Sequence, residues 1–465
     1  MMQLLRFCGF EDEEIESART RIEKTFDRLG IDSIDIGRAK KRLETYYDLD
    51  LESVRKGIGL CLKETANMVL ARDDGREKII FGFMSPATEI FGSSLRSESE
   101  DVFVANLNGS LQFILGAVFD KMKPVLEAAE QRWLKEGKAF HCANVKATLG
   151  LIALEMIPRP DLLITSGFLC DTAPKTLDLI EELLGIPTCS YDVCSDAEFS
   201  EYPVSRRVLE YGMKSTRRLI NRVEEVVRFK ITNSMLMETI EARSDFSKAL
   251  RKIKELMDTS DPVPIRANHD IIWHCVNILV RGNTEFEEPI DVLNLAVNEL
   301  TARVRKGEGP VKKGTPRVLS LLPSHFMDPR WEYLPYEYGM AVISTENGFF
   351  PPHGKRTPDI GNIDPDNPLE IILQYLKSSM NQNLSGRITV ILKVCENLKV
   401  DGVLNRYHVG CRIQVPDAMI MEEAITKELG IPVLLLEWEG FDPRFCDEDT
   451  FRMQLETFGN LLNQN

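Results

Sequence analysis

Three cysteines stand where an α/β protein usually keeps its chemistry. Cys142 in GKAFHCANVKATLG follows a Gly-Lys turn and opens a helix-like segment. Cys170 in LITSGFLCDTAPKT and Cys411 in RYHVGCR each follow an apolar strand-like run. Thiolates at helix N-termini are easier to keep ionised, and three such cysteines can hold three corners of an iron–sulfur cubane whose fourth iron stays open. One hypothesis is therefore a cluster bound by Cys142, Cys170 and Cys411.

Two alternatives stay open at this point. His141 beside Cys142 and His408 near Cys411 also permit a zinc site, and the sequence has no CxxC pair that would favour either metal. A free cysteine is moreover most often a small buried hydrophobe. We predict that structural role for the cysteines on apolar helix faces and for one near an N-terminus expected to be mobile: Cys61, Cys275, Cys395 and Cys8.

The elements that must position these cysteines recur in two similar stretches, 159–192 and 399–439. Each begins with an Asp and an apolar strand, reaches a loop cysteine, continues as a helix, and passes through Gly-Ile-Pro into another strand. The Gly is expected to cap the helix and the Pro to open the strand. Ligands of open parallel sheets bind beyond the carboxyl ends of the strands. If two such sheets face each other, Cys170 and Cys411 converge.

The pattern predicts two similar α/β domains, each built on a small parallel sheet, with additional N-terminal and middle helices. Apolar residues spaced three and four apart, such as Ile15, Ile22 and Phe26, indicate helices before the first strand. We expect a helical N-terminal region, a first α/β domain, a helical connection with a linker, and a second α/β domain, at 1–75, 76–230, 231–310 and 311–465.

Composition excludes several classes of protein. A chain of 465 residues is too long for one typical core, and a net charge of −15 argues against a nucleic-acid surface. No apolar run approaches the ~20 residues that span a bilayer, and the N-terminus lacks a signal peptide's apolar core. A cytoplasmic protein with reduced or metal-bound cysteines is expected. Neither a P-loop nor a convincing Gly-x-Gly-x-x-Gly motif is present.

Two further groups of residues carry weaker signals. EWEGFDPRF, with Trp438, Asp442 and Arg444, fits a polar site after a strand, but a surface turn with a local ion pair is favoured. Additional cysteines follow predicted strands and, with the first three, could supply a second bridged cubane: Cys189, Cys194 and Cys446. The favoured interpretation is that Cys189 points into the core from a strand and Cys194 is a surface thiol.

Over residues 76–465 the sequence resembles the 2-hydroxyacyl-CoA dehydratase family, which includes the benzoyl-CoA reductase subunits and double-cubane cluster proteins. The resemblance is carried by five stretches in order: SPATEI, HCANVKATLG, DLLITSGFLCD with LGIP, HVGCR with LGIPVLLLEWEGFDPR, and FRMQLETFGNLL. It departs from the family at Cys170, where CDTAPK replaces the usual Asp, Gly and basic run.

The resemblance implies two flavodoxin-like domains and a [4Fe–4S] cluster held by Cys142, Cys170 and Cys411. It also implies a separate ATP-hydrolysing iron–sulfur activator, a homologous subunit or a second copy of the chain, and an acyl-CoA or other small-molecule substrate, with neither a nucleic acid nor a membrane as partner. In dehydratases of this family radical chemistry removes a β-proton and an α-hydroxyl, and Ser85 and Glu89 in SPATEI are the candidate catalytic residues. Glu89 acting only at the N-terminus of the following helix is an equal alternative. Three functions fit: an acyl-CoA dehydratase or reductase subunit, a double-cubane reductase of a small molecule, or a non-catalytic electron relay.

Overall fold

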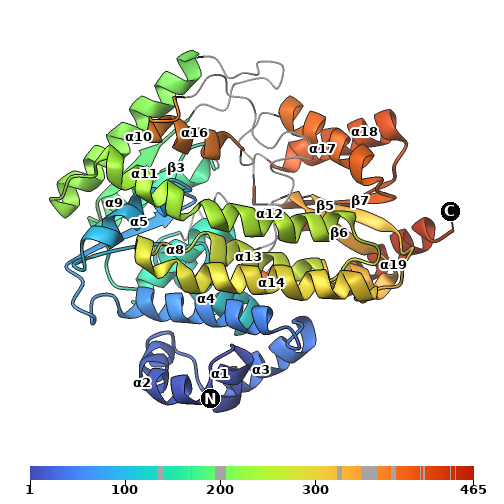
Figure 1. Ribbon diagram of the computed structural model, residues 1–465, viewed down its shortest axis with the longest axis horizontal. Helices are drawn as coiled ribbons and strands as arrows, with labels where there is room; N and C mark the ends of the chain where they lie inside the picture. Colours follow the sequence, from blue (N-terminus) through green and yellow to red (C-terminus); the bar gives the residue numbers. More distant parts are fainter. Residues whose placement is uncertain are drawn as a thin grey trace.

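Two parallel β-sheets organise the protein (Figure 1). The computed structural model describes residues 1–134, 141–168, 170–193, 206–321, 327–346, 364–378, 384–408, 410–411, 414–439, 441–445 and 447–464. Within these ranges the first sheet has the order β2-β1-β3-β4 and the second β6-β5-β7-β8. Every strand pair is parallel. The predicted fold class is therefore confirmed, and both orders follow the start of the flavodoxin-like order.

The strands are short, and all but β4 and β8, which are largely half-buried, are mostly buried. Those of the first sheet are β1 Lys78–Phe83, β2 Val102–Asn106, β3 Leu162–Ser166 and β4 Thr188–Tyr191. Those of the second are β5 Arg317–Leu321, β6 Ala341–Thr345, β7 Gly402–His408 and β8 Val433–Trp438. No strand is predicted at β2 from the sequence, because periodicity cannot tell so short an apolar run from a buried helix.

Helices surround both sheets (Figure 1). Before the first strand lie α1 Met2–Phe7, α2 Asp12–Arg28, α3 Ser33–Tyr46 and α4 Glu52–Leu70. Around the first sheet are α5 Thr88–Glu98, α6 Ser110–Phe113, η1 Ile114–Val118, α7 Met122–Arg132, α8 Ala143–Ala153, α9 Thr172–Leu184 and α10 Arg206–Val227. The middle segment forms α11 Asn233–Ala242, α12 Ser244–Thr259, η3 Ala267–His269, α13 Asp270–Asn277, η4 Asn283–Glu285 and α14 Glu287–Lys306. The last part contains α15 Arg330–Tyr333, η5 Leu334–Tyr338, α16 Pro368–Ser378, α17 Leu384–Leu398, α18 Gln414–Leu429, η7 Pro443–Phe445 and α19 Glu448–Leu462.

The first sheet is covered on both faces. Ile79 and Phe81 of β1 join a core with α4, whereas Ile80 joins a second core with α5 and α10. Adjacent strand residues point to opposite faces, so this division makes three layers, helix on sheet on helix. Helix α16 packs against α10 and α11 of the second core, although its sequence lies between β6 and β7 of the other sheet.

The N-terminal helices are firmly packed. The predicted apolar face of α2 is buried through Ile15, Ile22 and Phe26. Cys8 is only 2% exposed, and a Cβ added at Gly59 of α4 would come within 2.1 Å of the Cys8 carbonyl oxygen. The expectation that the chain around Cys8 is mobile is therefore wrong, because α1 lies directly against α4.

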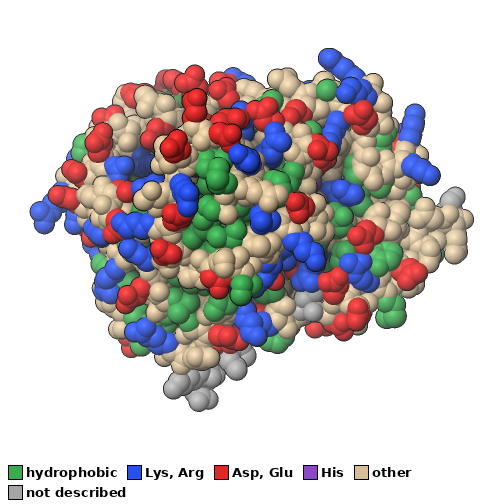
Figure 2. Space-filling view, turned by 90° about the horizontal axis from the view of Figure 1, so that it is seen from below, with side chains coloured by type: hydrophobic (Ala, Val, Ile, Leu, Met, Phe, Trp, Pro, Cys, Tyr) green, Lys and Arg blue, Asp and Glu red, His purple; other side chains and the backbone are tan. Residues whose placement is uncertain are grey.

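Two further features concern the helices and one face of the surface. In the described part of the chain, no helix combines the length and the apolar character needed to cross a membrane. On the face shown in Figure 2, basic and acidic side chains are interspersed.

Candidate functional site

The β3-α9-β4 and β7-α18-β8 units place Cys170 and Cys411 alike. In each sheet the strand before the cysteine pairs with the first strand on one side and the last strand on the other. Cys170 lies between β3 and α9, and Cys411 between β7 and α18. Gly185 and Gly430 follow the two helices with φ of +59° and +67°, as the predicted helix caps require. Both cysteines therefore lie beyond the carboxyl end of an equivalent strand.

Cys142 and Cys170 lie together at two helix N-termini. Cys142 is the N-cap of α8, and its sulfur accepts a hydrogen bond from the Val145 N–H. The Cys170 sulfur accepts one from the Ala173 N–H at 3.3 Å. Both cysteines pack in one small apolar group, whose other members are Phe83, Met84, Val145 and Ala173.

Gly410 brings the loop of the second sheet against this pair. A Cβ added at Gly410 would lie 3.2 Å from Cys142 Cβ and 3.0 Å from Glu439 Oε2. Gly410 immediately precedes Cys411. The cysteine loops of the two sheets therefore touch, and they touch at a residue that has no side chain.

Burial and neighbouring groups disfavour ionisation of the Cys142 and Cys170 thiols. Burial raises the pKa of Cys142 most, and the neighbouring Cys170, Glu439 and Cys411 raise it further. Burial also raises the pKa of Cys170, against the backbone N–H groups of Ala173 and Thr172, which lower it. A metal that displaced the thiol protons would remove this cost. The donor set is thus three thiols from three loops, which suits an iron–sulfur cluster in chemistry.

The described residues do not form a ready ligand set for a metal ion. Within these ranges no group of three or more His, Cys, Asp or Glu side chains, the three cysteines included, is placed so that it could hold one. The zinc alternative, with His141 or His408 as ligands, gains no support from them. The ring nitrogen Nδ1 of His141 instead lies 2.9 Å from the Thr176 hydroxyl.

Glu439 is a site residue that sequence reasoning missed. Its Oε2 accepts the Gly410 N–H at 3.2 Å and lies 2.9 Å from Nδ1 of His408, although those two atoms are not aligned for a hydrogen bond. Its other oxygen, Oε1, is buried without a hydrogen-bond partner in the described structure. Its place directly after β8 was the available signal, since polar residues at strand ends face ligands.

The EWEGFDPRF segment forms part of a buried ionic group. Arg444 pairs with Asp442 at 2.5 Å and with Glu130 of α7 at 2.8 Å, and Lys146 of α8 pairs with Glu130 at 3.0 Å. The predicted turn with a local ion pair is confirmed, and Phe445 in that turn is 69% exposed. The sequence did not predict that Asp442 is buried, at 1% exposed, or that Arg444 also reaches Glu130. Arg444 holds the pKa of Glu130 at about 2. These four residues, the Glu130–Arg444 group, tie the chain after β8 to the helix that begins at Cys142.

The candidate catalytic residues lie at the carboxyl end of β1 and are buried. Ser85 Oγ accepts a hydrogen bond from the Thr88 hydroxyl at 2.8 Å, and it also hydrogen-bonds the Tyr191 hydroxyl. Glu89 lies in the first turn of α5, 3.7 Å from Arg243. Both roles predicted for Glu89 are compatible with this position, and its catalytic role stays a prediction.

The remaining cysteines that the structure describes are packed in the core, as predicted from the sequence. Cys61 and Cys275 are 0% exposed, and Cys395 is 1% exposed. Cys189 lies in β4 and packs against the core that contains Ile80, α5 and α10. Cys194 and Cys446 lie outside the described residues, so their predicted roles stay predictions.

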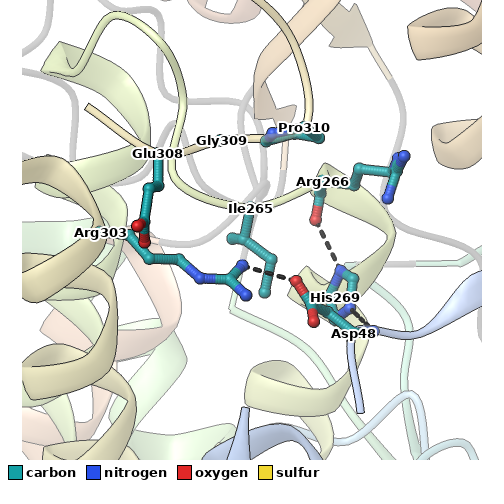
Figure 3. Close-up of a pocket in the computed structure, with 8 residues that line it drawn as sticks. All are labelled: Asp48, Ile265, Arg266, His269, Arg303, Glu308, Gly309 and Pro310. Carbon is teal, nitrogen blue, oxygen red and sulfur yellow. Dashed lines mark hydrogen bonds and ion pairs between the residues drawn. The ribbon is translucent and has the colours of Figure 1, made fainter. Parts of the chain in front are cut away.

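A cavity of about 270 Å³ lies elsewhere, where the linker, α14 and η3 meet the segment after α3 (Figure 3). Arg303 is paired with Asp48 at 2.5 Å. His269 Nε2 accepts the Asp48 N–H at 2.9 Å, and its Nδ1 lies 2.9 Å from the Arg266 carbonyl oxygen. His269 is thus the neutral tautomer with its proton on Nδ1. Asp48 and Arg303 in its lining neutralise each other, and the residues that line it include no cysteine.

Comparison with known proteins fixes the family. A family model described as the 2-hydroxyglutaryl-CoA dehydratase D-component matches residues 114–462. The chain belongs to the 2-hydroxyglutaryl-CoA dehydratase D-component family. The matched range contains Cys142, Cys170 and Cys411, and the resemblance stated from the sequence is confirmed.

Curated relatives of this D-component family are dehydratase and reductase subunits, as predicted. The chain is 24% identical to a benzoyl-CoA reductase subunit of Thauera aromatica over 349 residues, covering 70% of this chain and 77% of that protein. It is 22% identical to the (R)-2-hydroxyglutaryl-CoA dehydratase alpha subunit of Acidaminococcus fermentans, covering 66% of this chain and 62% of that protein. It is 20% identical to the (R)-phenyllactyl-CoA dehydratase alpha subunit of Clostridium sporogenes, covering 66% and 72%.

Proposed function

We propose that this chain is the iron–sulfur subunit of an acyl-CoA dehydratase or reductase, with a [4Fe–4S] cluster bound by Cys142, Cys170 and Cys411. Family membership supports the reaction class. The observation that carries the ligand set is the approach of Gly410 to Cys142, with 3.2 Å between the Cβ atoms if position 410 had one. This approach sets a cysteine loop of each sheet side by side, as a shared cluster needs.

In this proposal the protein holds the cluster and orients the groups that act on the substrate. When bound, such a cluster supplies low-potential one-electron chemistry and an open iron that acts as a Lewis acid. The Val145 and Ala173 N–H groups stabilise negative charge on the sulfurs of Cys142 and Cys170. Ser85 and Glu89 remain the candidates for moving a proton. Ser85 hydrogen-bonds the hydroxyl groups of Thr88 and Tyr191, and these three hydroxyls form a chain along which a proton would move.

The partners follow from the same proposal. The chain has no phosphate-cradling P-loop, so a separate ATP-hydrolysing iron–sulfur activator would supply the electron. A homologous subunit or a second copy of this chain would complete the enzyme, consistent with relatives that are named as subunits. The substrate would be an acyl-CoA thioester, and the enzyme would act in the cytoplasm.

Metal analysis of protein purified without air tests this proposal. We expect a brown protein with equal iron and acid-labile sulfide, about four of each per chain. Replacing Cys170 or Cys411 with Ser should remove most of the iron. Cys275→Ser is the matched control, because Cys275 is buried away from the site, and it should keep the iron. A colourless protein with one zinc per chain would overturn the proposal.

The two alternatives have their own outcomes. About eight irons per chain, reduced to four in the Cys189→Ser and Cys194→Ser double variant, would favour a double cubane. Four irons with no turnover of any acyl-CoA, even with activator and ATP, would favour an electron-relay subunit. ATP hydrolysis by the isolated chain would contradict the assignment of that activity to an activator.

A further inference from the structure

Met84 holds an unusual backbone position next to the cysteines. It follows β1 directly, and its φ is +50°, a left-handed value that residues other than glycine seldom adopt. Its N–H donates to Asn108 Oδ1 at 3.2 Å, and its carbonyl accepts the Ser166 N–H at 3.2 Å. Contacts to the chain after β2 and to β3 thus hold the backbone. The side chain is only partly buried and packs with Cys142 and Cys170.

Two carboxamides converge on the Met84 sulfur. The amide nitrogen of Asn108 lies 3.7 Å from Sδ, and that of Asn144 lies 3.9 Å from it. Each amide oxygen is engaged elsewhere: Asn108 Oδ1 accepts the Met84 N–H, and Asn144 Oδ1 accepts from Gln112 at 2.8 Å. The Met84 N–H can only donate, so it fixes which end of the Asn108 carboxamide faces the sulfur. The Gln112–Asn144 pair is assigned with Gln112 as the donor, which turns the Asn144 –NH₂ toward the sulfur. The –NH₂ groups therefore point at one place beside the cysteines.

The Met84 sulfur is a poor hydrogen-bond acceptor for the –NH₂ groups of Asn108 and Asn144. A thioether sulfur accepts hydrogen bonds poorly, whereas an amide –NH₂ is an ordinary strong donor. A carbonyl oxygen would make much better use of both groups. The donors are uncharged, which suits a neutral carbonyl, whereas phosphates and carboxylates are usually bound by Arg or Lys. The Met84 side chain is also flexible enough to move aside, since it has three rotatable bonds.

We propose that Asn108 and Asn144 bind the carbonyl oxygen of an acyl thioester, and that the Met84 side chain covers this site in the ligand-free protein. The inference rests on the proposed acyl-CoA function and names the residues that would recognise the reacting group. Hydrogen-bond donors fixed in this way also bind more strongly as negative charge develops on the oxygen. The thioester carbonyl would then lie next to Cys142 and Cys170, where the proposed cluster is held.

Paired ligands with and without the carbonyl test the assignment. The probes are benzoyl-CoA against S-benzyl-CoA, and acetyl-CoA against S-ethyl-CoA, each titrated into the full chain purified without air. Within each pair a methylene group replaces the carbonyl group, and the rest of the ligand is the same. The preference for thioester over thioether therefore reports on the two carboxamides, and the affinity for the thioether reports on the rest of the site.

Asn108→Asp keeps the oxygen that accepts the Met84 N–H and removes the –NH₂ group. We expect the thioester preference to fall about tenfold, the loss of one hydrogen bond, with thioether affinity unchanged. Asn108→Ser removes the same donor without adding charge and should lower the preference as well. Asn233→Asp makes the same substitution at an exposed position on α11, and it should leave both values unchanged. Met84→Ala should raise the preference, because it uncovers the donors.

The outcomes separate this inference from the proposed function. An unchanged preference in both Asn108 variants, or an equal fall for thioester and thioether, would overturn the carbonyl assignment. An unchanged or lowered preference in Met84→Ala would overturn the role of Met84 as a cover. Wild-type protein that holds iron but prefers neither thioester would overturn the inference together with the acyl-CoA function. Wild-type protein that prefers a thioester but holds no iron would overturn only the iron–sulfur proposal.

Discussion

Gly410 lies against Cys142 so closely that a methyl group at position 410 would come 3.2 Å from the Cys142 side chain and 3.0 Å from Glu439. The contact joins the loop after β7 to the N-terminus of α8. Few real Cβ atoms approach their neighbours so closely, and proteins accommodate an added methyl in such a packed place only by moving something. The spacing of the three cysteines therefore depends on the absence of a side chain at position 410.

Gly410→Ala should push the two cysteine loops apart by a few tenths of an ångström and lower iron binding. We expect the variant to lose half or more of its iron during anaerobic purification, as measured by iron content per chain. Gly37→Ala in α3 is the control, because no atom lies within 4 Å of the added Cβ and Ala favours a helix. Full iron content in Gly410→Ala would show that the two loops need not touch.

Gly150 allows α7 and α8 to cross closely, since a Cβ there would lie 1.9 Å from the Val125 carbonyl oxygen. That oxygen belongs to a helix backbone and cannot rotate away. Gly150→Ala should therefore separate the helices and lower the free energy of unfolding by about 2 kcal/mol. Thermal unfolding followed by circular dichroism measures the change. A midpoint equal to that of wild type would mean that the helices are less tightly packed than the structure indicates.

Arg444→Gln should leave Glu130 and Asp442 short of positive charge in a poorly hydrated place. Removing one partner of a buried ion pair lowers the free energy of unfolding by about 3 to 5 kcal/mol. We expect a loss of about 3 kcal/mol here, because Lys146 still contacts Glu130. The double variant Glu130→Gln, Arg444→Gln should lose less than the sum of the single variants. Arg19→Gln removes an exposed pair with Glu23 and should change stability by less than about 0.5 kcal/mol. Additive single losses would show that Glu130 and Arg444 are not coupled.

Acid should destabilise the protein through His269 and His274, because burial lowers the pKa of each from 6.5 to about 4. Between these values the unfolded state binds the proton and the folded state does not. Each histidine therefore contributes fully to the free energy of unfolding above pH 6.5. That contribution, about 3 kcal/mol for each residue, is lost as the pH falls toward 4. Unfolding midpoints measured from pH 7.5 to 4.5 should fall less steeply in His269→Gln. The same slope in the variant and in wild type would exclude His269 as a source.

The sequence by itself determined the repeated unit and its cysteines. The order Asp, apolar strand, loop cysteine, helix and Gly-Ile-Pro predicts β3-α9-β4 and β7-α18-β8, because strand burial and helix capping are local properties of neighbouring residues. It also indicated that Cys61, Cys275 and Cys395 are buried, since each lies on an apolar helix face. These predictions depend on the spacing of apolar residues and on which residues are neighbours in the sequence, and both can be read from one sequence.

Only the tertiary structure decided which distant residues meet. Glu130 and Arg444 are 314 residues apart, and nothing in either neighbourhood indicates the other, so the sequence predicted only the local ion pair of EWEGFDPRF. The contact of Gly410 with Cys142, the place of Glu439, and the two carboxamides at Met84 likewise depend on how two sheets and their helices pack. Such packing is set by the summed burial of whole faces, and no local spacing encodes the distance between two loops of different sheets.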